Sequence, residues 1–205
     1  MHPNPAFRSR DRAANVAFAR ERGFGILSLN GPDGPHVSHV PFLLSRDGTV
    51  LETHLVRSNP LARALPGSAA MAVAGPDGYI SPDWYGLSDQ VPTWNYVAVH
   101  LRGPLEIAPD EALRDLLDRQ SALFEEALAP KPAWTSAKMT PATMDRLMRA
   151  IVPCRMRVET VTGTWKLGQN KPDAARLGAA DGLAAYGTSP EARLLAELMR
   201  ALPET

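Results

Sequence analysis

Three short β-like runs follow one another so closely that no helix fits between them. They are FGILSLN at residues 24–30, HVSHVPFLL at 36–44 and TVLETHLV at 49–56, separated by GPDGP and SRDG. Glycine, proline, aspartate and serine are typical turn residues. Strands joined by such short loops run antiparallel, because a parallel pair needs a long crossover connection. The spacing therefore predicts an antiparallel meander and excludes a βαβ unit in this region.

Further strands and helices are predicted around the meander. The predicted strands are AAMAVAG (69–75) and GYIS (78–81), broken at GPDG, then TWNYVAVHLRGPLEI (93–107) and CRMRVETVTG (154–163). The predicted helices lie within 8–23, 59–65, 110–128, 140–151 and 189–202; the candidate caps are Ser9 or Asp11, then Asn59, Asp110, Thr140 and Ser189 in turn. The segment TWKLGQNKP (164–172) is predicted to be irregular. About six strands with helices around them indicate an α+β barrel or sandwich.

Composition narrows the class of protein. The chain has 205 residues, and its 22 basic and 22 acidic residues give a formal net charge of +0. This balance argues against direct binding of nucleic acid or of an anionic membrane. The sequence has no long apolar run, no signal-peptide pattern and a single cysteine, Cys154. We therefore expect one cytoplasmic domain spanning residues 1–205, with no membrane segment.

Common catalytic and metal-binding patterns are missing from the sequence. His36, His39, His54 and His100 fall in predicted strands, without the cysteine and histidine spacing of a zinc site. We expect hydrogen-bonded strand histidines and no metal. There is no GxSxG elbow, and Cys154 is expected to be a small buried hydrophobe. The fingerprints of dinucleotide-binding and phosphate-binding loops are also missing from the sequence.

The run PTWNYVAVH (92–100) has an unusual second face. As a regular strand it places Asn95 with the apolar Val97 and Val99 on one side. Trp94, Tyr96 and His100 would then share the other side. The first face suits a core, whereas the second face calls for a partner or a ligand.

Two polar segments are candidate binding sites. HLVRSNP (54–60) leaves a strand and combines Arg57, Ser58 and Asn59, which suits a phosphate monoester but also a simple capped turn. GTWKLGQNKP (163–172) combines an indole with several hydrogen-bond donors. Its Trp165 could equally anchor the loop on the core.

Four stretches together resemble the PaiB family of FMN-binding negative transcriptional regulators. They are VSHVPFLL, THLVRSNP, GYISPDWY with VPTWNYVAVHLRG, and GTWKLGQNK, and they occur in the family's order. The resemblance implies an antiparallel split β-barrel of six or more strands decorated with helices, related to pyridoxamine-phosphate oxidases. It also implies a homodimer with non-covalent FMN at the subunit interface.

The resemblance also implies the cofactor-binding residues. The strand that lines the flavin ring would contribute Ser38, His39 and Val40. The phosphate would be approached by His54, Arg57, Ser58 and Asn59. Trp94 and Asn95 would lie near the ring or the interface, and Lys166, Gln169 and Asn170 would reach across the dimer. Gly168 departs from the family pattern, which has serine there.

The function that the resemblance implies has two forms. The first is an FMN-binding protein that regulates transcription indirectly, since no DNA-reading element is evident in the sequence. The alternative is a flavin-dependent oxidoreductase or flavin reductase that uses NAD(P)H, since split-barrel reductases need no dinucleotide fingerprint. A haem-binding relative is a lesser alternative, and no catalytic residue can be assigned.

Overall fold

The computed structural model describes residues 2–8 and 10–203. Within that part of the chain there are seven strands and six α-helices. The strands are β1 (Phe24–Gly31), β2 (Gly34–Leu44), β3 (Val50–Val56), β4 (Gly67–Ile80), β5 (Thr93–Ile107), β6 (Ile151–Arg157) and β7 (Thr160–Lys166). The α-helices are α1 (Arg12–Arg22), α2 (Pro60–Arg63), α3 (Ala112–Glu126), α4 (Pro141–Met148), α5 (Asp173–Tyr186) and α6 (Ala192–Arg200). Three short 3₁₀ turns complete this part of the fold: η1 (Pro5–Arg8), η2 (Pro82–Tyr85) and η3 (Ser136–Lys138).

The seven strands form one antiparallel sheet in the order β4-β1-β2-β3-β6-β5-β7. β4 also pairs with β5, which closes all of these strands except β7 into a ring. A closed ring leaves fewer unpaired strand edges than an open sheet. The predicted α+β split β-barrel is confirmed. So is the meander, because β1 pairs with β2 and β2 with β3, both antiparallel.

The chain divides into two compact units. Unit 1 comprises Met1–Asn15, Ala74–Val99 and Thr162–Thr205, as far as these ranges are described, and unit 2 comprises Val16–Val73 and His100–Val161. The prediction of a single domain over residues 1–205 stays a prediction.

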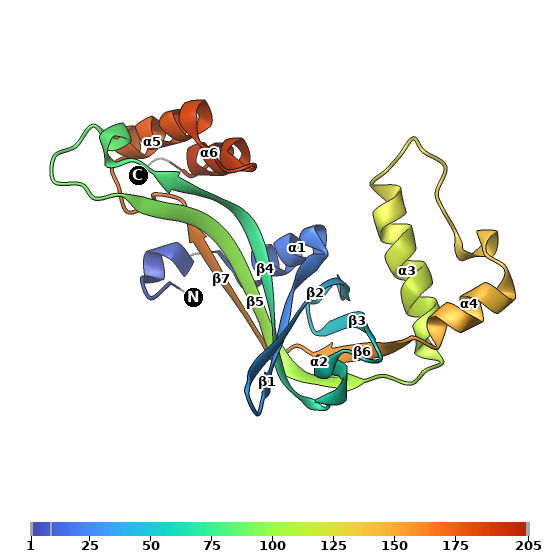
Figure 1. Cartoon of the computed structure of the whole chain (residues 1–205). Helices are drawn as coiled ribbons and strands as arrows, with labels where there is room; N and C mark the ends of the chain where they lie inside the picture. The colour runs from blue at the N-terminus through green and yellow to red at the C-terminus, as the bar shows by residue number, and fades with distance from the viewer. Residues whose placement is uncertain (1, 9, 204–205) are drawn as a thin grey trace. The chain divides into compact units, whose positions relative to one another are not determined.

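Unit 2 contains the meander, β6 and the helices α2, α3 and α4. Alternate residues of its strands are buried, and the core is formed by large apolar side chains: Leu27, Phe42, Leu51, Met71, Leu101, Leu105 and Met156. The helix α3 contacts β3 and β6 and is followed by a long loop and α4 (Figure 1). The first turn of α1 is capped as predicted, since the Asp11 carboxylate accepts a hydrogen bond of 2.7 Å from Ala14 N. Ser9, the other candidate cap, lies outside the described residues.

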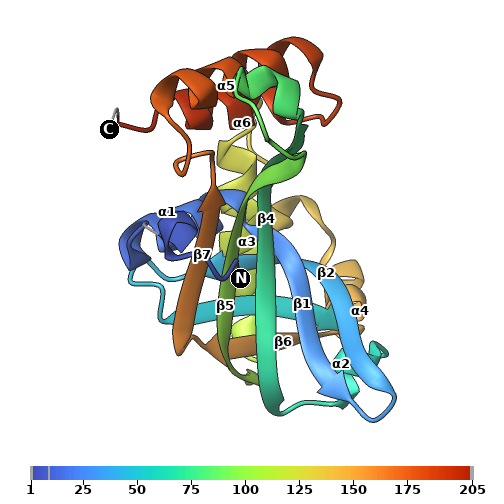
Figure 2. The ribbon, with the colours of Figure 1, turned by 90° about the vertical axis from the view of Figure 1, so that its left-hand side faces the viewer.

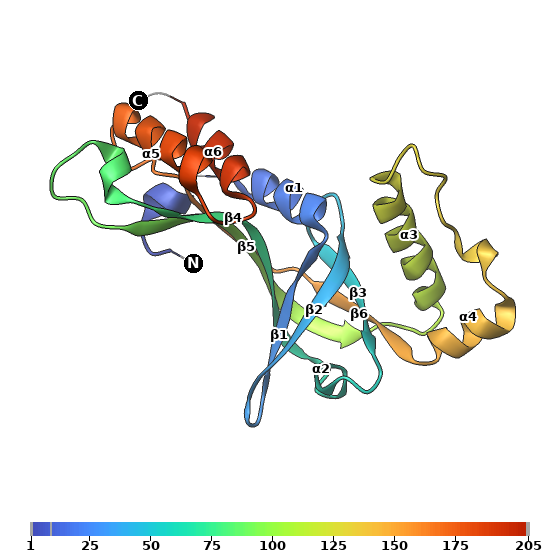
Figure 3. The same cartoon turned by 45° about the horizontal axis from the view of Figure 1, so that its top comes forward.

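Unit 1 contains the paired helices α5 and α6, which lie side by side (Figure 3). The helix α5 was not predicted. Its sequence, DAARLGAADGLAAY, is rich in alanine and glycine and has little contrast between its faces. Trp84 of η2 packs against this helix, and a Cβ at Gly182 would lie 2.4 Å from the indole. The small residues therefore serve the close approach of Trp84, which hides the helical pattern in the sequence.

The structure corrects several predicted boundaries. The GPDG run at 75–78 does not break the chain into two strands, because β4 continues through it. Burial shifts there from odd to even residues, as at a bulge. Part of the segment predicted to be irregular belongs to β7, which ends at Lys166.

Two predicted helix caps are wrong. Asp110 does not cap α3, because the cap position falls on Glu111, and the Asp110 carboxylate lies 3.7 Å from the Arg57 guanidinium. Ser189 does not cap α6 through its side chain, because its hydroxyl donates to Asp77 O. Asn59 does cap α2, and its Oδ1 accepts a hydrogen bond from Leu61 N. Thr140 occupies the cap position of α4 without such a bond.

Candidate functional site

Pleating of β2 places the predicted flavin-lining residues on two faces. Ser38 and Val40 lie on the inner face, where Val40 is buried in the core. His39 lies on the outer face and is exposed. Its ring stacks on Phe24 of β1, with ring centroids 6.5 Å apart and an interplanar angle of 30°. Because Phe24 is 52% exposed, the pair forms an open aromatic surface.

One edge of β2 is open beside Ser38. β3 pairs with β2 only over Phe42–Leu44, so in the described structure the preceding part of that edge has no strand partner. The short helix α2 lies beside β2 instead (Figure 2). Asn59 bridges the two, because its Nδ2 donates to Ser38 Oγ at 2.8 Å while its Oδ1 caps α2. The sequence therefore brings Ser38, His39 and Asn59 to one strand edge.

Arg57 and Ser58 lie at the exposed end of β3. The Arg57 guanidinium donates to the carbonyls of Arg149 and Ile151, at 3.2 and 3.3 Å. Carbonyl oxygens satisfy its donors without neutralising its charge, and the exposed carboxylate of Asp110 forms a loose ion pair with it at 3.7 Å. The side chain of Arg57 remains about half exposed. Arg57 therefore supplies positive charge one residue before the exposed Ser58.

His54 lies on the β3 surface that α3 covers. Its Nδ1 is buried without a hydrogen-bond partner among the described residues, and so is Nε2 of Gln120 on α3. Burial lowers the pKa of His54, and interaction with Gln120 opposes this only partly. The imidazole is thus a neutral group that faces a helix.

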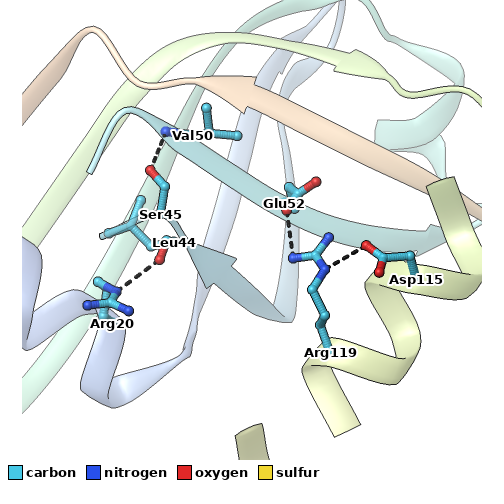
Figure 4. A network of polar contacts seen from close by, with 7 residues as sticks. All are labelled: Arg20, Leu44, Ser45, Val50, Glu52, Asp115 and Arg119. Atoms are coloured by element: carbon cyan, nitrogen blue, oxygen red, sulfur yellow. Dashed lines mark hydrogen bonds and ion pairs between the residues drawn. The ribbon is translucent and has the colours of Figure 1, made fainter. Parts of the chain in front are cut away.

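A groove of about 470 Å³ lies on the outer side of the β2–β3 hairpin. Figure 4 shows its polar network: Arg20 Nε donates to Leu44 O at 3.0 Å, and Arg119 binds both Glu52 and Asp115. Burial works to lower the pKa of Arg119, but the hydrogen bonds to the two carboxylates outweigh it and raise the pKa. Val50 N donates to Ser45 Oγ at 2.9 Å and closes the hairpin (Figure 4). The carboxylates around Arg119 make this network an internal brace between α3 and the sheet.

In unit 1, Trp94 and Asn95 point in opposite directions. Asn95 is 1% exposed and donates to the sulfur of Met199 at 3.6 Å, whereas Trp94 is 49% exposed. The Trp94 indole donates to Asp77 Oδ1 at 3.0 Å and meets Tyr79 edge to face. The predicted alternation of this strand is confirmed. A single ligand facing Trp94 therefore cannot also face the side chain of Asn95 without a break in the strand.

Both the oxygen and the nitrogen of the Gln169 amide are hydrogen-bonded inside unit 1. Its Oε1 accepts from Leu167 N at 2.8 Å, and its Nε2 donates to Ala6 O and Trp165 O at 3.1 and 2.6 Å. Trp165 is 8% exposed, and its indole donates to Asn15 Oδ1 at 2.8 Å. Trp165 therefore anchors this loop on the core. Gly168, at φ +84°, adopts the left-handed conformation that favours glycine over the serine of the family pattern.

Lys166 and Asn170 flank that anchored loop. The Lys166 ammonium donates to Thr93 Oγ1 and lies 5.8 Å from the centre of the Phe7 ring. Burial, followed by the nearby positive charge of Lys171, lowers the pKa of Lys166. Asn170 is exposed.

The predicted residues thus form one group in each unit. Unit 2 gathers Ser38, His39, Val40, Asn59, Arg57 and Ser58 around β2 and the end of β3, and places His54 under α3. Unit 1 holds Trp94, Asn95, Lys166, Gln169 and Asn170. Sequence reasoning missed Phe24 as the neighbour of His39. The register of a β1–β2 hairpin could have revealed it. Cys154 is buried as expected, and burial raises the pKa of its thiol to about 12.

A comparison with models of protein families shows which family the chain belongs to. A family model described as "Putative FMN-binding domain" matches residues 1–160. The chain belongs to this FMN-binding family. The resemblance to the PaiB family is confirmed, and FMN is the cofactor of the family. The matched range contains the β2 edge, Arg57 and Asn59, whereas Lys166, Gln169 and Asn170 lie beyond it.

Known proteins agree with this assignment. "Protease synthase and sporulation protein PAI 2" of Bacillus subtilis is 27% identical over 186 residues, which cover 89% of this chain and 88% of that protein. An uncharacterized protein of Saccharomyces cerevisiae, YKL070W, is 30% identical over 128 residues, covering 56% of this chain and 75% of that protein.

Solved structures share the fold. The FAD and heme binding protein from Mycobacterium smegmatis aligns with a TM-score of 0.55 and 19% identity, covering 77% of this chain and 72% of that one. The flavocytochrome Anf3 from Azotobacter vinelandii aligns with a TM-score of 0.56 and 17% identity, covering 76% and 67%. No helix in the described part of the chain is long and apolar enough to cross a membrane.

Proposed function

We propose that this FMN-binding protein holds its flavin along the open edge of β2 in unit 2. The observation that carries the proposal is the hydrogen bond between Ser38 and Asn59 beside the exposed pair of Phe24 and His39. A flavin ring needs hydrogen-bond partners at its polar edge and an aromatic or apolar wall. The unpaired backbone N–H and C=O groups of the β2 edge supply the partners, and the exposed ring of His39 on the outer face supplies the wall. The residues present therefore fit the cofactor.

The phosphate of the flavin would lie toward Arg57, Ser58 and Asn59. Arg57 contributes positive charge, the exposed Ser58 contributes a hydroxyl, and the amide of Asn59 is held in place by its two hydrogen bonds. Charge-assisted hydrogen bonds of this kind are stronger than neutral ones. Bound FMN would supply redox chemistry of the isoalloxazine ring, while these residues bind and orient it.

We also propose that the protein is a homodimer that encloses the flavin. Exposed apolar side chains occur on β1, β2 and β3 of unit 2: Phe24, Val37 and Val56. The alternation of burial puts each of them on the outer face of its strand, where a partner subunit would cover it. In this arrangement Lys166 and Asn170 would reach across the dimer as the resemblance implies, whereas the amide of Gln169 is held by Leu167, Ala6 and Trp165 and would position their loop. Analytical ultracentrifugation tests the association state.

The regulatory role that the PaiB relatives suggest would be indirect. The formal net charge of +0 gives the chain as a whole no net electrostatic attraction to DNA. We therefore expect no salt-dependent shift of promoter DNA in a gel-shift series. The alternative, an oxidoreductase that uses NAD(P)H, predicts steady oxidation of NADH or NADPH when FMN is bound. A redox-inactive holoprotein would exclude that alternative.

Reconstitution with FMN tests the proposed site. The purified chain is titrated with FMN, and bound flavin is measured by quenching of flavin fluorescence. Ser38→Ala should weaken binding by about tenfold, because it removes the hydrogen bond that positions Asn59 beside the phosphate. Ser68→Ala changes an exposed residue of β4 in the same unit; it is the matched control and should bind FMN as the wild type does. Equal affinities for all three proteins would contradict the placement at β2.

A further inference from the structure

Unit 1 contains a cavity of about 340 Å³ that the flavin-binding residues of unit 2 do not use. It is lined by Ala6, Arg10, Gln169, Lys171, Asp173, Arg176, Leu202 and Pro203. Its volume falls in the range of small-molecule sites, about 300–1,000 Å³. Most of these residues lie beyond the range matched by the FMN-binding family. The cavity therefore needs an explanation of its own.

The lining of the cavity is strongly basic. Three of its side chains are cationic and one is acidic, which leaves a formal charge of +2. The one acid, Asp173, already binds Arg176 at 2.7 Å. Among the described residues Arg10 and Lys171 have no acidic partner: Arg10 lies 5.5 Å from the centre of the Trp165 ring, and Lys171 contacts Gln90 and Tyr85. Two cations thus face the cavity without neutralisation.

The cavity is also built rigidly. Arg176 is 2% exposed, and its guanidinium is fixed by Asp173 and by the carbonyl of Met199. Gln169 ties the loop to Ala6 on the opposite segment through a hydrogen bond of 3.1 Å. A preorganised site loses less entropy when it binds a ligand. The buried charge of Arg176 is paired with Asp173, so this residue holds the wall of the cavity in place.

We propose that this cavity binds the phosphate group of a phosphate monoester. A phosphate monoester carries close to two negative charges at neutral pH, which matches the formal charge of the lining. Arg10 and Lys171 bind the phosphate oxygens, the Arg176–Asp173 pair holds the wall in place, and Ala6, Leu202 and Pro203 contact the organic part. Burial is the main cause of the lowered pKa of Lys166, and repulsion by the nearby charge of Lys171 adds to it. A bound dianion relieves that repulsion.

Binding is tested on the full chain without flavin, by isothermal titration with glycerol 3-phosphate. Glycerol is the uncharged control ligand. Lys171→Met and Arg10→Gln are expected to weaken binding by about tenfold each, because each removes a charged donor. Arg193→Gln, an exposed arginine on α6 of the same unit, is the matched control and should bind as the wild type does. Unchanged melting temperatures will show that all variants are folded.

The source of the phosphate is distinguished by a second titration on protein saturated with FMN. If glycerol 3-phosphate still binds, the natural ligand is a separate phosphorylated molecule. If FMN blocks it and riboflavin does not, the cavity takes the phosphate of FMN, and the placement of that phosphate at Arg57 is wrong. No binding to the wild type, or equal binding to the double variant of Arg10 and Lys171, would overturn the proposal. Because the first titration contains no flavin, its result is independent of the flavin site proposed for unit 2.

Discussion

The two groups of predicted cofactor residues differ in how their hydrogen bonds are used. In unit 1, Gln169 and Asn95 are committed to partners inside the unit, and Trp165 is bound to Asn15. In unit 2, Ser38 and Asn59 bind one another beside an open strand edge, and His39 is exposed. Residues whose types suit a ligand equally well in the sequence therefore fall into two classes once their hydrogen-bond partners are known: those already bound inside the protein and those open to a ligand. The first group braces a loop, whereas the second can receive a cofactor.

Substitutions of two tryptophans are expected to differ most in their effect on the free energy of unfolding. Trp165→Ala should lower the free energy of unfolding by about 3–5 kcal/mol, because it empties a buried site and removes the partner of Asn15. Trp94→Ala is the matched control, and it should cost about 1 kcal/mol, since half of that side chain already faces solvent. Chemical denaturation followed by circular dichroism measures both. Equal losses would show that Trp165 does not anchor the loop.

Gln169 and Asn170 sharpen the same contrast within one loop. Gln169→Ala removes three hydrogen bonds and should lower the free energy of unfolding by about 1–3 kcal/mol. Asn170→Ala changes an exposed side chain and should stay within about 0.5 kcal/mol of the wild type. Thermal melts measure the difference. If Asn170→Ala were the more damaging variant, the bracing role assigned to Gln169 would be wrong.

Substitution of His39 tests whether the residues of unit 2 bind the flavin ring. His39→Ala should weaken FMN and riboflavin binding alike by about threefold to tenfold, because it removes one aromatic wall of the ring site. Its exposed position predicts little change in melting temperature. A control variant, His36→Ala on the inner face of β2, should leave the affinity for FMN unchanged. Loss of FMN affinity without loss of riboflavin affinity would instead place His39 at the phosphate.

The smallest expected effect is a dependence of stability on pH. Burial lowers the pKa of both His54 and His100 in the folded chain, so the unfolded chain takes up protons first as the pH falls. Stability is then full above the unfolded pKa and declines below it. The melting temperature should fall between about pH 7.5 and about pH 5.5, and less so in His54→Gln. An equal fall in the variant would mean that His54 is not held neutral beneath α3.

Local sequence chemistry predicts part of this fold well. The meander, the Asn59 cap before Pro60 and the alternation around Asn95 all follow from short-range rules that the structure obeys. The helix α5 could not be predicted in this way, because its glycines accommodate Trp84 from a distant segment. The use of Asp110 and Ser189 also depends on distant partners, Arg57 and Asp77. Short-range rules cannot anticipate such contacts.

The candidate site shows the same limit. The family resemblance identifies the candidate site residues, and the two-residue alternation of a strand correctly places Trp94 and Asn95 on opposite faces. The sequence does not reveal that the Gln169 amide donates to the carbonyls of Ala6 and Trp165, or that α3 covers His54. Those facts depend on which side chains meet in space.

The most direct test of the flavin site is equilibrium binding of FMN and riboflavin to the wild type and to Asn59→Asp. Aspartate caps a helix as well as asparagine does, so the variant should fold normally. Its carboxylate would repel the flavin phosphate, and FMN affinity should fall by about tenfold or more while riboflavin affinity stays unchanged. Unaltered FMN binding by Asn59→Asp, or no FMN uptake by the wild type, would contradict the account.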